Sequence, residues 1–151
     1  MEKIQPNLSP ITEQPIDVIG LFEQSNHPKA GAIVFFSGTV RNHHDGKGVH
    51  YLSYECYVPM AEKMIREILK AALEKYELHH VLCQHRIGKV AIGESAVVVV
   101  TGASHRQEAY TANRYIIDRV KYEVPIWKRE YFEDGAVVWA HNSGKREFEN
   151  Q

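Results

Sequence analysis

The sequence predicts an α+β or α/β sandwich in which two long helices cover one mixed or antiparallel sheet. Two observations carry this prediction. Apolar residues recur about every 3.6 positions in two long segments, 59–76 and 105–122, which indicates amphipathic helices. Runs rich in β-branched residues stand before, between and after these segments, and they are typical of strands. The order along the chain is roughly α-β-β-α-β-β-α-β-β.

The length and charge favour one globular domain. A chain of 151 residues can bury a single core without disulfides or metal ions, so we expect one domain over 1–151 with a polar tail at about 141–151. The formal net charge of −1 gives no global attraction to nucleic acid or acidic membranes. Any anion site must therefore be local.

Cysteine spacing and hydropathy predict a cytoplasmic protein. Cys56 and Cys83 stand alone, without a CxxC or zinc-type spacing, which suits a reducing compartment. The N-terminus has no apolar stretch of signal-peptide length, and no apolar run approaches the roughly 20 residues of a membrane span. We expect the chain to be neither exported nor embedded in a membrane.

The first half of the chain predicts one short helix and two strands. Residues 16–24 are a short amphipathic segment, which Asn26 and Pro28 close. Residues 31–40 are a β-rich apolar run, and 49–57 are typical of a second strand. The polar loop HHDGKG joins the two, so we expect them to form a hairpin.

The second half predicts two strands between the long helices and a hairpin at the end. Residues 81–88 form the first strand, and 95–102 are a continuous β-branched run, typical of a strand covered on both faces. Pro125 ends the helix predicted over 105–122. The remainder, 126–140, contains the Asp-Gly signal of a final hairpin.

Charge is unusual at three places, the first of which is TGASHRQEAY. Ser104 and Gln107 have capping-box spacing, so His105 and Arg106 are predicted in the first helical turn. The helix dipole disfavours cations there, unless a bound phosphate or carboxylate uses them together with the free backbone N–H groups. The alternative is an exposed pair whose charges are screened by water and salt.

The second place is SGTVRNHHDG, where Arg41 ends an apolar strand. Strand ends that open into loops are common sites for binding groups, although an arginine at such a position is also often a solvated edge residue. The neighbouring His43 and His44 suggest a metal site only weakly, because adjacent strand residues point to opposite faces and no third ligand has a recognisable spacing.

The third place is KYEVPIWKREY. Lys121 falls in the last turn of its helix, where the dipole favours a cation, so a structural role suffices for it alone. A chain reversal at Pro125 would bring Lys121 close to Lys128. Within about 4–6 Å each ammonium would disfavour the other's charge, and one lysine would become a base near pH 7, although two solvated lysines remain an alternative. Strand alternation sets Ile126, Lys128 and Glu130 on one face and Trp127, Arg129 and Tyr131 on the other.

The motifs GTVRNHHDG, SHRQEAY and KYEVPIWKRE, in this order, resemble the large, catalytic subunits of molybdopterin synthase, over about 31–139. The resemblance implies an α/β hammerhead fold with an added antiparallel β subdomain. It also implies conversion of cyclic pyranopterin monophosphate to molybdopterin, with sulfur delivered by the Gly-Gly C-terminal thiocarboxylate of a small ubiquitin-like partner. Two large subunits and two small ones would form a heterotetramer, and no cofactor, metal, nucleic acid or membrane is implied.

The resemblance also implies residue roles. Lys121 and Lys128 would be the catalytic pair beside the thiocarboxylate. An anion pocket for the substrate would use Arg41 together with His105 and Arg106, the last two supplied across the dimer interface. The substrate would further meet Thr39 and Val40 through their backbone, and Arg129 and Glu130 as neighbours that bind or orient.

Some family features are absent or unneeded in this chain. Family members often place an arginine soon after the tryptophan that matches Trp139, whereas here AHNSG follows and Lys145 or Arg146 comes only later, so that role is not carried over. A thiocarboxylate donor makes a cysteine sulfur carrier unnecessary, and we expect Cys56 and Cys83 to be core residues.

Two other classes of function are consistent with parts of the sequence. A noncatalytic nucleotide- or nucleic-acid-binding module would use the many tyrosines with Trp127 and Arg129, but the net charge is near zero and no RNP-like motif occurs. A metal-dependent hydrolase would use some of the nine histidines, and we expect no bound metal.

Overall fold

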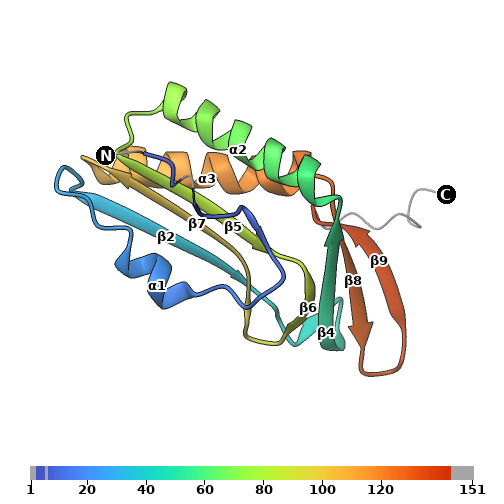
Figure 1. The fold of residues 1–151 in the computed structure, drawn as a ribbon. Coiled ribbons are helices and arrows are strands. Elements are labelled where there is room, and N and C mark those ends of the chain that lie inside the picture. Colours follow the sequence, from blue (N-terminus) through green and yellow to red (C-terminus); the bar gives the residue numbers. More distant parts are fainter. Residues whose placement is uncertain (1–2, 6, 144–151) are drawn as a thin grey trace.

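The computed structural model describes residues 3–5 and 7–143 and arranges them as two sheets and three helices (Figure 1). One sheet has the strand order β1-β5-β7-β2, and the other has the order β3-β4-β8-β9, with β6 also paired to β4. The α+β class with an added antiparallel β subdomain is confirmed by this arrangement.

The first sheet is mixed. Its strands are β1 (Ile11–Thr12), β5 (His80–Arg86), β7 (Ser95–Ala103) and β2 (Ala32–Thr39). β1 runs parallel to β5, whereas the other neighbours are antiparallel. β7 is buried along nearly its whole length, as its continuous β-branched run predicts.

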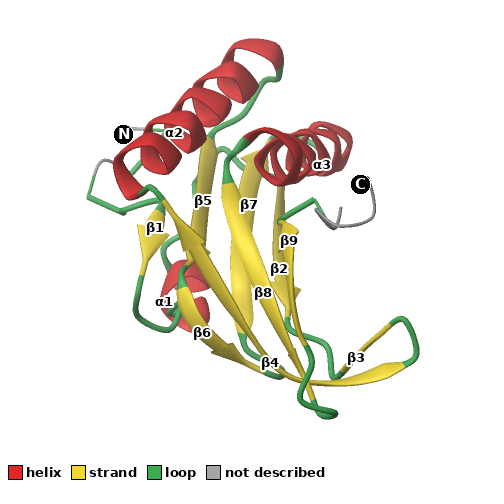
Figure 2. Cartoon of the chain, turned by 90° about the vertical axis from the view of Figure 1, so that its right-hand side faces the viewer, coloured by secondary structure: helices red, strands yellow, loops and turns green. Residues whose placement is uncertain are grey.

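Helices cover both faces of the first sheet (Figures 1 and 2). The long helices α2 (Val58–Lys75) and α3 (Arg106–Glu123) lie on one face, and the short α1 (Val18–Glu23) lies on the other. Their predicted apolar faces are confirmed, because both long helices bury one side in the main core. That side comprises Ala61, Ile65, Ile68, Leu69 and Ala72 of α2 and Ala109, Ala112, Ile116 and Val120 of α3.

The second sheet is antiparallel and projects beyond the first (Figure 1). The predicted final hairpin is confirmed, with Gly135 in the left-handed region at its turn. The strands are β3 (His43–His44), β4 (Lys47–Cys56), β6 (Gly88–Ala91), β8 (Ile126–Phe132) and β9 (Val137–His141).

The predicted hairpin between 31–40 and 49–57 is wrong. β2 pairs with β7 in the first sheet, and β4 pairs with β8 in the second. The chain changes sheet at Val40, whose backbone N–H donates to Glu94 O and whose carbonyl accepts from Gly93 N. The turn at Asp45 and Gly46 joins only β3 to β4, in a small hairpin. β2 ends at Thr39, before this turn, and takes no part in the hairpin.

The predicted polar tail at 141–151 begins too early. His141 ends β9, and Asn142 is 2% exposed. Residues 144–151, including Lys145 and Arg146, lie outside the described part of the chain. Within the described ranges, no helix is long and apolar enough to cross a membrane.

Candidate functional site

A small polar cavity of about 150 Å³ lies where the two sheets meet. Five of the residues predicted from the sequence line it, namely Thr39, Arg41, Lys121, Lys128 and Glu130. The walls also include His43, His44, Val49, Leu52 and Tyr54. The structure therefore brings together side chains from β2, β4, α3 and β8 that are up to 91 positions apart in the sequence.

Lys121 is partly buried in the last turn of α3. Burial lowers the pKa of its ammonium to about 8, with a further contribution from the nearby charge of Lys128. The predicted approach of the two lysines is thus present, because α3 ends before Pro125 and β8 runs back along the cavity.

The alternation predicted for β8 explains which of its charges enter the cavity. Lys128 and Glu130 line it from one face of the strand. Arg129 lies on the other face, where it donates hydrogen bonds to Glu55 Oε1 and to the Tyr131 hydroxyl, both at 3.0 Å. Its guanidinium also stacks 3.9 Å from the centroid of the Trp139 ring. The structure does not bring Arg129 to the cavity.

Glu130 is a buried carboxylate, with 1% of its surface exposed. His44 Nδ1 donates to its Oε2 at 2.5 Å, whereas Oε1 has no hydrogen-bond partner in the described structure. Burial and the charge of Glu130 raise the pKa of the Tyr54 hydroxyl above its usual value. His44 was not among the predicted site residues, although it follows Asn42 by two positions in the GTVRNHHDG motif and precedes the Asp-Gly turn.

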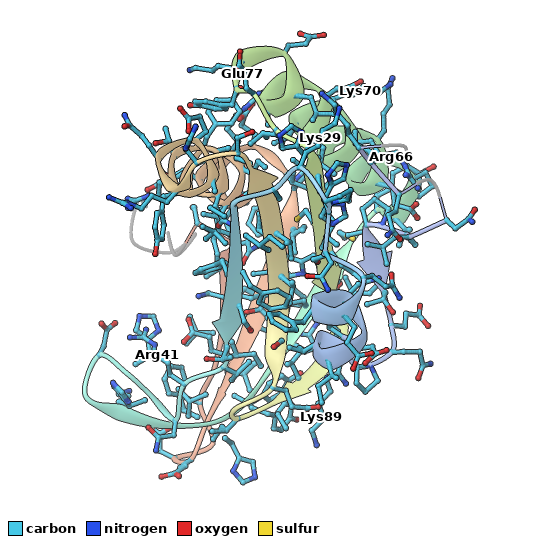
Figure 3. All side chains as sticks on the ribbon, turned by 90° about the vertical axis from the view of Figure 1, so that its left-hand side faces the viewer. Lys29, Arg41, Arg66, Lys70, Glu77 and Lys89 are labelled. Carbon is cyan, nitrogen blue, oxygen red and sulfur yellow. The ribbon has the colours of Figure 1, made fainter. Side chains whose placement is uncertain are left out.

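Thr39, Val40 and Arg41 have different positions although they are consecutive. Thr39 is the last residue of β2 and lines the cavity. Arg41, in the loop between β2 and β3, also lines the cavity (Figure 3). Val40 is buried behind the cavity, and both of its backbone polar groups are bonded to the turn at Gly93 and Glu94.

His105 and Arg106 are exposed at the opposite end of α3 from Lys121. Sixteen residues of helix correspond to about 24 Å, so one chain does not bring them to the cavity. The predicted capping box is wrong. The N-cap is His105 and not Ser104, and the His105 side chain makes no capping hydrogen bond. The Ser104 hydroxyl is bonded instead to His79 Nε2 at 2.8 Å.

An apolar groove of about 690 Å³ lies between α3 and β2, and Lys121 also lines it. Val34, Phe36, Ile117 and Tyr122 form much of its wall. Lys121 therefore stands between this groove and the polar cavity, and it is accessible from both. Of the predicted core cysteines, Cys83 is buried in the main core, whereas Cys56 is only partly buried against it.

The cavity combines fixed positive charge with a lysine that loses its proton near pH 8. Such a site can bind a compact anion and accept a proton. Within residues 3–5 and 7–143, no cluster of three or more His, Cys, Asp or Glu side chains is arranged to hold a metal ion.

Comparisons with known proteins give a consistent family. The family model described as MoaE protein matches residues 11–123. The molybdopterin synthase catalytic subunit of Thermoplasma volcanium is 45% identical over 129 residues, which cover 85% of this chain and 94% of that protein. The molybdopterin synthase catalytic subunit of Bacillus subtilis is 45% identical over 125 residues, covering 83% and 80%.

Solved structures agree. Molybdopterin synthase from Staphylococcus aureus has a TM-score of 0.80 at 39% identity, and the match covers 86% of this chain and 94% of that one. A complex of subunits 1 and 2 of the molybdopterin-converting factor from Helicobacter pylori has a TM-score of 0.71 at 22% identity, covering 92% and 90%, and it supports the fold.

Proposed function

The chain belongs to the MoaE protein family, and from this premise we propose that it transfers sulfur from a thiocarboxylate to cyclic pyranopterin monophosphate. The family predicted from the sequence is confirmed, since curated relatives at 45% identity are molybdopterin synthase catalytic subunits. The protein is a catalytic subunit of that enzyme and acts in molybdenum cofactor biosynthesis. Sulfur transfer is the specific step proposed for its site.

The observation that carries the proposal is the position of Lys121. It is a partly buried amine with a pKa of about 8, its charge interacts with that of Lys128, and it lines both the cavity and the groove. A donor that begins as a thiocarboxylate ends as a carboxylate. Water must therefore replace sulfur on the acyl carbon, and a base must take a proton from that water.

The proposed transfer then has two balanced steps. The thiocarboxylate sulfur attacks a side-chain carbon of the pterin substrate as a C–O bond at that carbon breaks. The oxygen leaves with the bonding electron pair and takes up a proton, and the pterin is then joined to the partner's tail as a thioester. Water adds to the acyl carbon as the neutral Lys121 amine takes its proton, the acyl C–S bond breaks, and a carboxylate and a pterin thiolate result. Arg41 and Lys128 supply fixed positive charge for the substrate phosphate and for the developing anions.

We assign the apolar groove to the C-terminal tail of a small ubiquitin-like partner. The groove is mainly apolar and is lined by Lys121, so an extended Gly-Gly tail lying in it could present its terminal thiocarboxylate to the amine. The related Helicobacter pylori protein is named as a complex of two subunits, which fits a partner of this kind.

The second half of the anion pocket comes, on this proposal, from another copy of the chain. His105 and Arg106 are exposed and about 24 Å along α3 from Lys121, so a twofold pair of subunits would place them at each other's cavities. The assembly is then a dimer of large subunits with one small subunit at each end. We propose a single domain over 1–151 that acts in the cytoplasm, where the free thiols Cys56 and Cys83 persist.

Reconstitution tests this function directly. The protein is combined with a thiocarboxylated partner and cyclic pyranopterin monophosphate, and the dithiolene product is measured after conversion to a fluorescent pterin. We expect product with the thiocarboxylated partner and none with the same partner ending in a plain carboxylate. Absence of product from folded, mutually bound components would refute the proposal. A noncatalytic nucleic-acid-binding module would instead show affinity that falls steeply with salt.

A further inference from the structure

His85 is a buried, chemically capable side chain that the proposed reaction does not use. It lies on β5, on the face that carries the main core, and it is 1% exposed. The edge of its ring packs against the ring of Tyr54 with 5.0 Å between centroids, and Tyr54 lines the cavity. His85 therefore lies directly behind the cavity wall.

The hydrogen bonds of His85 fix its tautomer. Its Nδ1 is 2.7 Å from the carbonyl oxygen of Arg86, and because a carbonyl only accepts, Nδ1 carries the proton. Its Nε2 accepts from Asn142 Nδ2 at 3.0 Å. Both ring nitrogens are used, and the ring is neutral, since burial lowers its pKa to about 4.

Asn142 joins the two sheets through this contact. It follows β9 of the second sheet, its backbone N–H donates to Ile126 O at the start of β8, and its amide donates to His85 on β5 of the first sheet. Ile126 is two residues before Lys128 on β8. The bond between His85 and Asn142 therefore fixes how β8 lies relative to the first sheet and to the last turn of α3.

His85 is also near enough to Lys121 for the charge of this lysine to contribute to the lowered pKa of the imidazole. Other titratable groups face Lys121 across the cavity. They are Lys128 and Glu130 on β8, Arg41 in the loop after β2, His43 and His44 on β3, and Tyr54 on β4. A carboxylate at the position of His85 would add a counter-ion beneath Lys121, whereas the neutral imidazole adds none.

We propose that His85 is a positioning residue for the lysine pair. Through Asn142 it fastens the second sheet beneath the end of α3 and so sets the separation of Lys121 and Lys128. As a polar but uncharged group, it bonds to the buried Asn142 amide and adds no counter-ion next to Lys121. The inference deepens the proposed function, because it rests on Lys121 acting as the base.

The first experiment titrates Lys121 without requiring turnover. The rate at which Lys121 is acetylated by a trace of acetic anhydride is measured against pH by peptide mass spectrometry, for the wild type, His85→Gln and His85→Glu. We expect the midpoint in His85→Gln to stay near the wild-type value, because the amide is also neutral. In His85→Glu the midpoint should rise by about one pH unit or more.

His80→Gln is the matched control. His80 is a buried histidine on the same strand, 6% exposed, whose side chain faces the opposite side of the sheet from His85. Its replacement should leave the Lys121 midpoint unchanged. The proposal is overturned if His85→Glu titrates like the wild type, or if His80→Gln shifts the midpoint as much as His85→Glu does.

Asn142→Ala decides the matter if His85→Glu does not fold. It leaves His85 in place and removes only the bond between the sheets. We expect kcat to fall about tenfold or more with KM within about twofold of the wild type, because the lysines lose their spacing while the anion-binding groups remain. A wild-type kcat would overturn the positioning role. The acetylation midpoints could shift as expected while the wild-type protein forms no dithiolene. That result would refute the proposed function but not the positioning role of His85.

Discussion

The two ends of α3 have opposite environments. At the C-terminal end, the partly buried Lys121 lines both a polar cavity and an apolar groove, and the neutral imidazole of His85 lies behind it. At the N-terminal end, His105 and Arg106 are exposed, and the hydroxyl of Ser104 is bonded to His79 instead of to the helix. One end therefore holds a cation that burial makes easy to deprotonate, and the other holds cations in water.

This difference teaches how one helix can serve two sites. The helix dipole favours a cation at the C-terminal end, yet burial outweighs it and lowers the pKa of Lys121. At the N-terminal end the dipole disfavours cations, and no side chain caps the first turn. Its free N–H groups and the two cations suit a bound anion, and in the proposed dimer each end of α3 would supply half of a pocket.

The largest expected effect comes from removing the amine at the buried end. Lys121→Met keeps the length of the side chain and its apolar contacts, so we expect the protein to fold and to bind its partner while kcat falls about 10³-fold. The measurement is single-turnover dithiolene formation. Lys70→Met, an exposed lysine on α2, is the control and should have wild-type kcat. A tenfold loss or less in Lys121→Met would show that another group is the main base.

Mixing variants tests whether the two ends belong to the same pocket. A dimer of Lys121→Met and His105→Ala subunits would contain one doubly altered and one intact pocket if each pocket combines both chains. Equal mixing then restores about a quarter of the wild-type activity, because half of the dimers are mixed. If His105 served the cavity of its own chain, the mixture would be no more active than its parts.

The dependence of stability on pH should distinguish His85, near the C-terminal end of α3, from His79, near its N-terminal end. The ordinary pKa of histidine is 6.5, and that of His85 is about 4, so between pH 6.5 and pH 4 the unfolded chain binds a proton that the folded protein does not. Stability should therefore fall as the pH falls, by about 3 kcal/mol from this residue. Denaturant unfolding at pH 7 and pH 4 measures it. His85→Gln should lose this part of the dependence, and His79→Gln should retain it.

The outer face of β8 gives a smaller effect. Arg129→Met removes a half-exposed ion pair with Glu55 and the stacking on Trp139, and we expect a loss of about 1 kcal/mol of stability. Because Arg129 faces away from the cavity, kcat/KM should fall less than tenfold, and far less than in Lys128→Met. Equal losses in the two variants would place Arg129 in the substrate site, as the family resemblance implies.

The smallest effect is expected at the exposed end of α3. Ser104→Ala should cost less than about 0.5 kcal/mol, because its hydroxyl does not cap the helix. Asp17→Ala is the comparison, since Asp17 caps α1 by accepting from Gly20 N at 3.1 Å, and its loss should cost about 1 kcal/mol. Thermal unfolding of both variants measures the difference. A larger cost at Ser104 would mean that its hydroxyl does stabilise α3.

The sequence predicts the local elements and the meeting of the lysines well, for clear physical reasons. Helix periodicity locates α2 and α3, strand alternation separates Lys128 from Arg129, and Pro125 marks the reversal that brings Lys121 near Lys128. Each of these sequence patterns involves residues that are close together along the chain. The structure that each pattern predicts follows from local sterics or from the pleat of a strand.

The missed features depend on contacts between distant parts of the chain. β2 pairs with β7, more than fifty residues away, and not with the next strand. His44 is hydrogen-bonded to Glu130, 86 positions away in the sequence. The Ser104 hydroxyl is hydrogen-bonded to His79 and does not cap α3. A capping-box pattern contains no information about a competing partner on another strand, so the local prediction had no means of excluding one.

The crossover at Val40 limits where the surroundings of the cavity can change. Val40 is held by Gly93 and Glu94, and Val49 N donates to Asn42 O, so the loop between the sheets is anchored at both of its ends. Replacements at the exposed turn, residues 45–47, can thus change the charge near the cavity with little effect on the core, whereas His44 is held by its bond to the buried Glu130. Such changes would alter the surroundings of the proposed anion site while the lysines and their support stay constant.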